Sequence, residues 1–351
     1  QKYTNKLLKL NNKHKVKKLS HKDLIYPFGC NASQKKAVAA AFEHQVSVVQ
    51  GPPGTGKTQT ILNVIANIVR NGETVLVVSN NNSAITNVQE KLEKYGLAFI
   101  VAPLGSKENK ELFISQQTIV PAEVSSWSCS MQDGMRMKST LHDTLRSLDK
   151  VYALLNEDAM LRQEQQSVDL EWRHFSMDNG IDEHTPLERR VQSSLIIRLW
   201  LHYQSKADGT LIAPDGLWSR ITEGLKSLWM RMICRYRLRL PGKFEQSDMK
   251  PLVIELQTLY YLNRRIEIEE RLETIRQKLS TYDADLLTKT LTDTSMTLFK
   301  ASLHGRYAKK ESVLFKDTKD MKAHGEDFLK RYPVVLSTTF SARSCVFGDK
   351  P

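Results

Sequence analysis

Residues 51–58, Gly-Pro-Pro-Gly-Thr-Gly-Lys-Thr, follow the pattern G-x-x-x-x-G-K-[ST], which is typical of a phosphate-binding loop. Its glycines let the backbone curl so that successive N–H groups face one anion at the start of a helix. In such a loop Lys57 reaches the β- and γ-phosphates of a nucleoside triphosphate, and the Thr58 hydroxyl binds Mg²⁺. Lys57 and Thr58 are therefore the candidate catalytic residues, with Thr58 as the candidate metal ligand. A Gly-Pro turn that matches by chance is the alternative interpretation.

The segments around this loop predict alternating strands and helices. An apolar, β-branched run at 46–50 predicts a strand, and apolar residues at spacings of three and four predict a helix at 57–70. Further strands are expected at 74–78 and 98–101, with a helix at 83–95 between them, and a strand signal returns at 332–339. This order predicts an α/β fold with a parallel sheet, interrupted by a helical insertion of about 200 residues.

Two apolar seams predict long helices within the insertion. They are Leu141, Leu145, Leu148, Tyr152 and Leu155, and then Ile268, Leu272, Ile275, Leu279, Tyr282 and Leu286. Both have heptad-like spacing, so we expect the two helices to pair antiparallel as a coiled-coil stalk. Four tryptophans between residues 172 and 229 are interpreted as a small helical core, with base stacking as the alternative.

The composition limits the class of protein. At 351 residues the chain is long enough for two domains, and it lacks a run of about 18 apolar residues, so we expect no membrane partner. Its four cysteines form no C-x-x-C pair, which favours a reducing, intracellular (cytoplasmic) location. The chain begins with Gln1 instead of Met, so we expect it to be a fragment.

The net charge of +12 is concentrated in two segments. Residues 1–22 contain eight lysines and no acid, and residues 218–243 contain seven basic residues against Glu223 alone. Local basic segments favour a polyanionic partner, although a solvated arm and an ordinary surface helix explain them equally well.

Three sequence words together resemble the superfamily 1 helicases, and most closely the 1B branch that contains the RNA helicase of nonsense-mediated decay. They are residues 31–34 (Asn-Ala-Ser-Gln), the loop at 51–58, and residues 79–85 (Ser-Asn-Asn-Asn-Ser-Ala-Ile). The resemblance implies a RecA-like motor domain with ATP and Mg²⁺ as cofactors. It also implies that Gln34 reads the adenine edge, although Gln34 and Asn31 fit a helix capping box equally well. The expected cofactor-binding residues are Gln34, Gly51, Pro52, Pro53, Gly54, Thr55, Gly56, Lys57, Thr58 and Gln59.

The same resemblance implies contacts with single-stranded DNA or RNA at the ends of two strands. The residues concerned are Asn80, Asn81, Asn82 and Ala84 after one strand, and Ser337, Thr338 and Thr339 after the last. Small polar side chains and free N–H groups suit phosphate contact. A helix N-cap and a polar strand end are the alternatives.

The expected domains are a basic arm at 1–25, the first part of the RecA-like domain at 26–119, the insertion at 120–330, and the resumed domain at 331–351. In the family a D-E-x-x strand supplies the acid and a metal ligand, and the chain ends before such a strand. We therefore expect nucleotide binding with little hydrolysis, and a parent protein that is an ATP-driven helicase or translocase. The alternatives are another P-loop ATPase, or a nucleotide-binding scaffold whose insertion recruits a protein partner.

Overall fold

A computed structural model describes residues 23–209, 217–240, 249–308 and 313–342. It divides into two compact units, one formed by Gln1–Lys150 with Asp283–Pro351 and the other by Val151–Tyr282. Of the expected arm at 1–25, residues 1–22 lie outside the described residues. The domain limits inferred from the sequence stay a prediction, and the second unit falls within the expected insertion.

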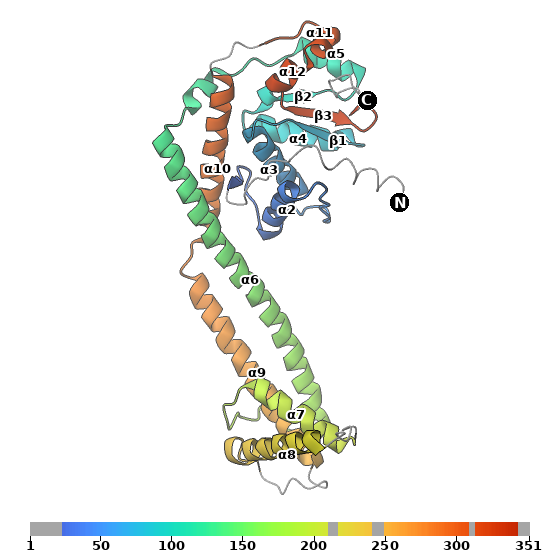
Figure 1. The fold of residues 1–351 in the computed structure, drawn as a ribbon, viewed down its shortest axis with the longest axis vertical. Coiled ribbons are helices and arrows are strands. Elements are labelled where there is room, and N and C mark those ends of the chain that lie inside the picture. Colours follow the sequence, from blue (N-terminus) through green and yellow to red (C-terminus); the bar gives the residue numbers. More distant parts are fainter. Residues whose placement is uncertain (1–22, 210–216, 241–248, 309–312, 343–351) are drawn as a thin grey trace. The chain divides into compact units, whose positions relative to one another are not determined.

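The first unit contains a three-stranded parallel sheet covered by helices (Figure 1). Its elements are α2 (Ala32–Glu43), α3 (Lys57–Arg70), β1 (Val75–Ser79), α4 (Asn82–Lys94), β2 (Val101–Pro103), α5 (Lys107–Ser115), α10 (Ala284–Tyr307), α11 (Thr318–Ala323), α12 (Gly325–Arg331) and β3 (Val334–Thr338). The long helix α6 (Met131–Asn179) begins in this unit and ends in the other.

Strand β3 is the centre of the sheet, although it comes last in the sequence. It pairs in parallel with β1 from Val75↔Val334 to Ser79↔Thr338, and with β2 from Val101↔Val334. Its residues Val334, Val335 and Leu336 are almost fully buried because both edges and both faces are covered. The predicted parallel sheet, resumed after a helical insertion, is therefore confirmed.

Two strand predictions were wrong. Residues 46–50 form no strand, and Val46 and Val48 are 81% and 88% exposed. Strand formation needs a neighbouring strand to pair with, and no described strand lies beside this segment. The strand expected at 98–101 begins only at Val101, because residues 98–100 form a 3₁₀ turn closed by a hydrogen bond from Ile100 N to Leu97 O (3.2 Å).

In its described residues, the second unit contains helices and connecting loops but no strand. Besides the end of α6 it contains α7 (Ser193–Ala207), α8 (Leu217–Met232) with the short π-helix η5 (Ile233–Arg237), and α9 (Met249–Leu279). Trp172 of α6 is 1% exposed and packs against Tyr261 of α9. Of the tryptophans predicted to form a core, Trp172 is buried and Trp200 packs against an apolar cluster, whereas Trp229 is 56% exposed, so the prediction was wrong for Trp229.

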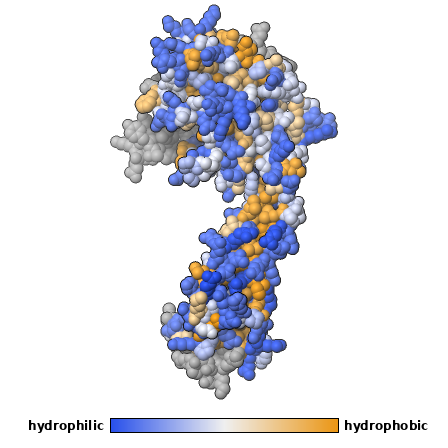
Figure 2. Space-filling model, turned by 180° about the vertical axis from the view of Figure 1, so that it is seen from behind, coloured by the Kyte–Doolittle hydropathy of each residue, from blue (hydrophilic) through white to orange (hydrophobic). Residues whose placement is uncertain are grey.

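Helices α6 and α9 run antiparallel in this unit. Arginines of α9 pair with acids of α6, and the last arginine pairs with the first acid: Arg271 with Glu157 (2.6 Å), Arg264 with Glu164 (2.7 Å) and Arg265 with Asp169 (2.7 Å). Charged pairs outside an apolar seam are typical of paired helices, but the coiled-coil geometry itself stays a prediction. On the face that Figure 2 shows, hydrophilic residues dominate and hydrophobic stretches interrupt them along the helices.

The second predicted seam does not continue in one helix. Helix α9 ends at Leu279, and Asp283 caps a new helix by accepting a hydrogen bond from Leu286 N at 2.9 Å. Leu286 is 58% exposed, so its place in the seam was wrong. An Asp at the N-cap satisfies the free N–H groups of the new helix, and this local preference interrupts the apolar spacing.

Candidate nucleotide site and the neighbouring strand ends

The phosphate loop leads directly into helix α3. Gly54 and Gly56 have φ angles of 86° and 76°, a left-handed conformation that glycine adopts without strain. No side chain of the described residues caps α3, whereas Asn31 caps α2 and Asn81 caps α4. The first N–H groups of α3 therefore remain open to an anion, as the loop sequence predicts.

The side chain of Lys57 closes back onto this loop. Its Nζ donates to the carbonyl oxygens of Gly51 (2.6 Å) and Pro52 (2.8 Å), and Thr55 Oγ1 also donates to Pro52 O (2.8 Å). Lys57 is exposed, and these acceptors are uncharged carbonyls. A phosphate could therefore replace them as a stronger, charged acceptor without a carboxylate having to be displaced.

Gln34 is buried beneath the loop, with both ends of its amide hydrogen-bonded. Its Oε1 accepts from Asn31 N (2.9 Å), while its Nε2 donates to Thr55 O (3.1 Å) and to Gln59 Oε1 (3.2 Å). Asn31 Oδ1 in turn accepts from Gln34 N (2.9 Å), which completes a capping box. The capping role is thus present in the structure, and adenine contact by Gln34 stays a prediction.

The sequence analysis missed the structural role of a row of amides on α3. Gln59, Asn63 and Asn67 follow each other at intervals of four, and Asn63 and Asn67 are at most 1% exposed. Their amides bind the backbone of residues 25–29, which leads to the cap of α2. Gln59 Nε2 donates to the carbonyl of residue 28 (2.5 Å) and Asn63 Nδ2 to that of residue 29 (2.7 Å), while Asn67 both donates to and accepts from residue 25 (2.7 and 2.9 Å). Three amides on one face of an otherwise apolar helix were the available signal.

A hollow of about 260 Å³ adjoins the loop within the first unit. It is lined by Ser33, Gln34, Ala37, Ala40, Ser47, Val48, Val49, Gln50, Thr55, Lys57 and Thr60. Its walls come from α2, the segment before the loop and the start of α3. The hollow therefore has an apolar side and a polar side next to the Lys57 ammonium, which suits a flat ring joined to phosphates.

Two ionisable groups near the cap of α2 are held neutral. Burial raises the pKa of the Cys30 thiol to about 12, although Lys35 opposes the shift. Burial likewise raises the pKa of the Tyr26 hydroxyl. At neutral pH Cys30 is therefore a thiol and not the thiolate that nucleophilic chemistry needs. Both groups therefore serve packing.

The two segments expected to contact nucleic acid meet at one edge of the sheet. Parallel pairing sets Ser79 beside Thr338, and Thr339 Oγ1 donates to Asn80 Oδ1. Asn81 Oδ1 caps α4 by accepting from the backbone N of residue 83 (2.9 Å). The capping alternative is thus present here, and the neighbouring Asn80, Asn82 and Ala84 are exposed.

The side chains at the end of β3 differ in their exposure. Ser337 is 1% exposed, so its side chain does not reach the surface, whereas Thr339 is exposed. Phe340, which the sequence analysis did not single out, is 96% exposed directly after them. A lone aromatic ring in solvent beside polar strand ends is a surface on which a base can stack.

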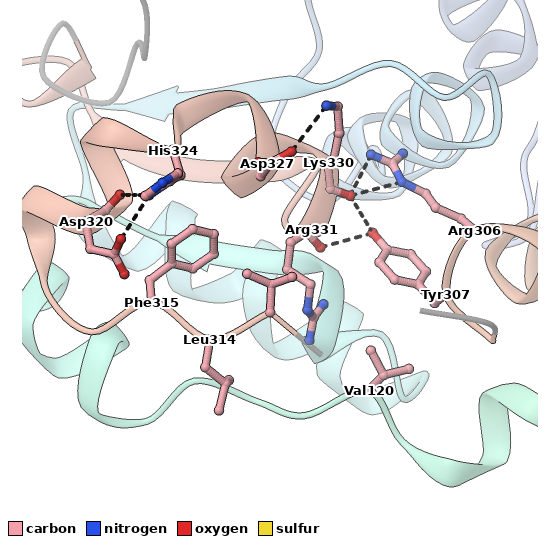
Figure 3. A pocket seen from close by; sticks show the side chains of 11 residues that line it. Val120, Arg306, Tyr307, Leu314, Phe315, Asp320, His324, Asp327, Lys330 and Arg331 are labelled. Carbon is pink, nitrogen blue, oxygen red and sulfur yellow. Dashed lines mark hydrogen bonds and ion pairs between the residues drawn. The ribbon is translucent and has the colours of Figure 1, made fainter. Parts of the chain in front are cut away.

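Side chains of α10 fix the entry to β3 (Figure 3). Arg306 Nε and Nη2 donate to Lys330 O at the end of α12 (3.1 and 2.9 Å), and Tyr307 OH donates to Arg331 O (3.0 Å). Cationic donors suit the negative end of a helix dipole. These bonds hold the last turn of α12 in place, so the strand that follows enters the sheet in a fixed register.

Arg331 links this entry to the rest of the sheet. It is 6% exposed, and its Nη1 and Nη2 donate to Phe99 O (2.6 Å) and Thr118 O (2.7 Å). Burial lowers the pKa of its guanidinium, but the neighbouring ring of Tyr332, 4.5 Å from the guanidinium carbon, favours the cation. The ionisable side chains that line the hollow of about 330 Å³ beside it all bond to other groups of the protein.

Other site classes find no support in the described residues. Within them, no group of three or more His, Cys, Asp or Glu side chains could hold a metal ion. In the same part of the chain, no helix combines the length and the apolar character that a membrane span requires.

Comparison with known proteins identifies the family. A family model described as AAA domain (AAA_11) matches residues 29–349, and the chain belongs to this family. The expected resemblance to the superfamily 1B helicases of the nonsense-mediated-decay branch is confirmed, for part of the first motor region. No solved structure matches the chain.

Individual relatives match over shorter parts of the chain. The chain is 36% identical over 90 residues to "Regulator of nonsense transcripts 1" of Caenorhabditis elegans (25% of this chain, 8% of that protein). It is 38% identical over 71 residues to "DNA polymerase alpha-associated DNA helicase A" of Schizosaccharomyces pombe (20% and 11%). It is 43% identical over 69 residues to "DNA-binding protein SMUBP-2" of Rattus norvegicus (19% and 7%). The matches thus span about a tenth of these relatives or less.

The amide row on α3 generates a stability prediction. Asn67→Ala leaves both the N–H and the carbonyl of Ile25 buried without a partner, so we expect the free energy of unfolding to fall by about 2–4 kcal/mol. Urea unfolding followed by circular dichroism measures this loss. Asn87→Ala on the exposed side of α4 is the matched control and should change the value by less than about 0.5 kcal/mol. Equal effects of the two changes would show that the row is not structural.

The contact between Gly56 and Gln34 generates a second prediction. A Cβ at Gly56 would lie 2.1 Å from Gln34 Nε2, whereas a Cβ at Gly72, which has a similar φ of 82°, would meet no atom within 4 Å. Gly72→Ala should therefore cost about 1–2 kcal/mol of backbone strain, and Gly56→Ala clearly more. The excess should shrink when Gln34→Ala accompanies Gly56→Ala in a double-mutant cycle. Identical losses for the two glycines would rule out the packing of Gln34 against the loop.

Proposed function

We propose that this chain is the ATP-binding part of a nucleic-acid helicase or translocase. The observation that carries the proposal is the uncapped start of α3 behind a loop with two left-handed glycines and Lys57. Free N–H groups, a helix dipole and one flexible cation are the donor set that the phosphates of a nucleotide require. Membership of the AAA domain family and the helicase names of the relatives support the same conclusion.

The proposed roles follow from the positions of the side chains. Lys57 exchanges the carbonyls of Gly51 and Pro52 for the β- and γ-phosphates, and the Thr58 hydroxyl binds the Mg²⁺ that accompanies them. The adenine occupies the hollow beside α2, where the Gln34 amide turns from the loop carbonyls to the base edge. When bound, Mg²⁺ neutralises phosphate charge.

We further propose that the chain hydrolyses ATP slowly by itself. The sequence contains one Asp-Glu pair, Asp182-Glu183, and it lies in a turn after α6 in the second unit instead of at a strand end. Phosphoryl transfer depends on positioned charges, and the described residues that line the hollow beside the loop include no Asp or Glu, so we expect little catalysis. We propose that helicase or translocase activity on nucleic acid requires the whole protein. We also propose that this protein acts inside the cell, where ATP is available.

Single-stranded DNA or RNA is the proposed partner at the edge formed by β1 and β3. Exposed Asn80, Asn82 and Ala84 offer amides and N–H groups for phosphates, and Thr339 extends this row across the two strands. Phe340 then provides a stacking surface beside the backbone contacts. Because the strand ends and the loop at Lys57 belong to the same unit, nucleotide and nucleic acid can influence each other through the sheet.

Nucleotide binding is tested by titration calorimetry with ATP, ADP and GTP in the presence of Mg²⁺. We expect an adenine preference that weakens with Gln34→Ala, and an affinity for ATP that falls at least about tenfold with Lys57→Ala, because a phosphate loses its cationic partner. Lys94→Ala on exposed α4 removes the same charge elsewhere and should have no effect. Equal affinities for ATP and GTP would remove the role of Gln34, and unchanged binding by Lys57→Ala would refute the site.

Nucleic-acid binding is tested by fluorescence anisotropy with labelled oligo-dT and oligo-U at several salt concentrations. Affinity should fall steeply with salt as phosphate contacts release counterions. Phe340→Ala should weaken binding about 5- to 100-fold through lost stacking, whereas Phe340→Trp should retain it. Leu112→Ala, which truncates an exposed apolar side chain elsewhere in the same unit, is the control. Equal binding by Phe340→Ala and the wild type would exclude this edge as the path.

A further inference from the structure

Helix α8 and the following π-helix turn one face into the core of the second unit. Met230, Cys234 and Leu238, spaced by four residues, are at most 6% exposed and belong to the same apolar cluster as residues of α7 and α9. This face anchors the helix in its unit. Its other side is therefore presented to the surroundings in a fixed orientation.

The opposite face carries a stripe of exposed apolar side chains. Its members are Leu225 (62% exposed), Leu228 (57%), Trp229 (56%), Met232 (53%) and Tyr236 (73%). Their spacings of three and four place them along one side of the helix, over a length of about 16 Å. Large apolar residues gathered in this way, on a face that the helix does not need for its own core, indicate an interaction surface.

Several cations accompany this stripe. Arg231, Arg235, Arg237 and Arg239 are all exposed, and the sequence from 224 to 240 contains no Asp or Glu. Such a face repels a second copy of itself and attracts negative charge. The partner must therefore combine an apolar surface with acidic groups at its sides.

The composition and width of the stripe distinguish between three kinds of partner: nucleic acid, a bilayer and a protein helix. Nucleic acid would use the arginines and the aromatic rings but would leave Leu225, Leu228 and Met232 in water. A bilayer favours a broad apolar face, whereas this stripe has the width of the seam between two packed helices. Arginines directly beside a seam pair with acids at the flanking positions of a partner helix.

We propose that the apolar stripe of α8 and its flanking arginines dock an acidic amphipathic helix of another protein. The partner helix lays a row of leucine-like side chains along Leu225, Leu228, Trp229, Met232 and Tyr236, and its Asp and Glu residues face the arginines. Only one helix face is offered, so the partner lies alongside α8 and does not enclose it.

The test uses the full chain and two fluorescein-labelled, 28-residue synthetic helices with leucine at the a and d positions. One has glutamate at e and g, the other lysine. Anisotropy should show binding of the glutamate helix and at least tenfold weaker binding of the lysine helix. Leu228→Asp with Met232→Asp should abolish binding, while Leu201→Asp on exposed α7 of the same unit should not. Both stripe residues are more than half exposed, so circular dichroism should show an unchanged fold.

A charge reversal makes the test specific. Arg231→Glu with Arg235→Glu should switch the preference from the glutamate helix to the lysine helix. The proposal is wrong if neither helix binds, or if the Leu228→Asp, Met232→Asp chain still binds. A third outcome would also contradict the proposal. If the glutamate helix never binds, but the wild-type chain binds phosphatidylserine vesicles or oligo-U and the Leu228→Asp, Met232→Asp chain does not, the surface serves a membrane or nucleic acid.

Discussion

The hydrogen bonds between the amides of α3 and the backbone of residues 25–29 are the constraint on which the candidate nucleotide site depends. Gln59, Asn63 and Asn67 donate hydrogen bonds to the backbone carbonyls of residues 28, 29 and 25, which pair with no described β-strand. They fix the start of α2 and therefore the position of Gln34. The Gln34 amide in turn bonds to the phosphate loop at Thr55 and to Gln59. Because buried polar groups are costly without partners, this geometry tolerates little adjustment.

The sheet imposes a second constraint, this time on the insertion. Its central strand, β3, is the last in sequence, so the chain must return from more than 200 residues of helices to the position between β1 and β2. Arg306 and Tyr307 hold the end of α12, and Arg331 reaches the carbonyls of Phe99 and Thr118. The bonds of Arg331 link residues on both sides of the expected insertion. They explain how the sheet can stay intact whatever the inserted helices contact.

Sequence patterns predicted the local structure of the candidate site where one motif encodes that structure completely. The phosphate loop, the helix behind it and the parallel strands after it follow from glycine positions and apolar spacing within about 30 residues. The same patterns could not find Phe340, because exposure depends on what the rest of the chain covers. They could not decide between helix capping and adenine contact for Gln34, because both roles are compatible with the same residues at 31–34. The four-residue spacing of the amides on α3 can be seen in the sequence, but the sequence does not show that they bond to the backbone of residues 25–29.

By itself the sequence determined the loop that can hold phosphates, the α/β order around it and the long amphipathic helices, because these depend on preferences of neighbouring residues. The tertiary structure decided which apolar segments are covered. Residues 46–50 have strand composition but lie outside the sheet, Leu286 continues a seam but follows a capped helix start, and Trp229 is exposed on α8. Burial and strand pairing require a partner from elsewhere in the chain, and local pattern carries no information about where that partner lies.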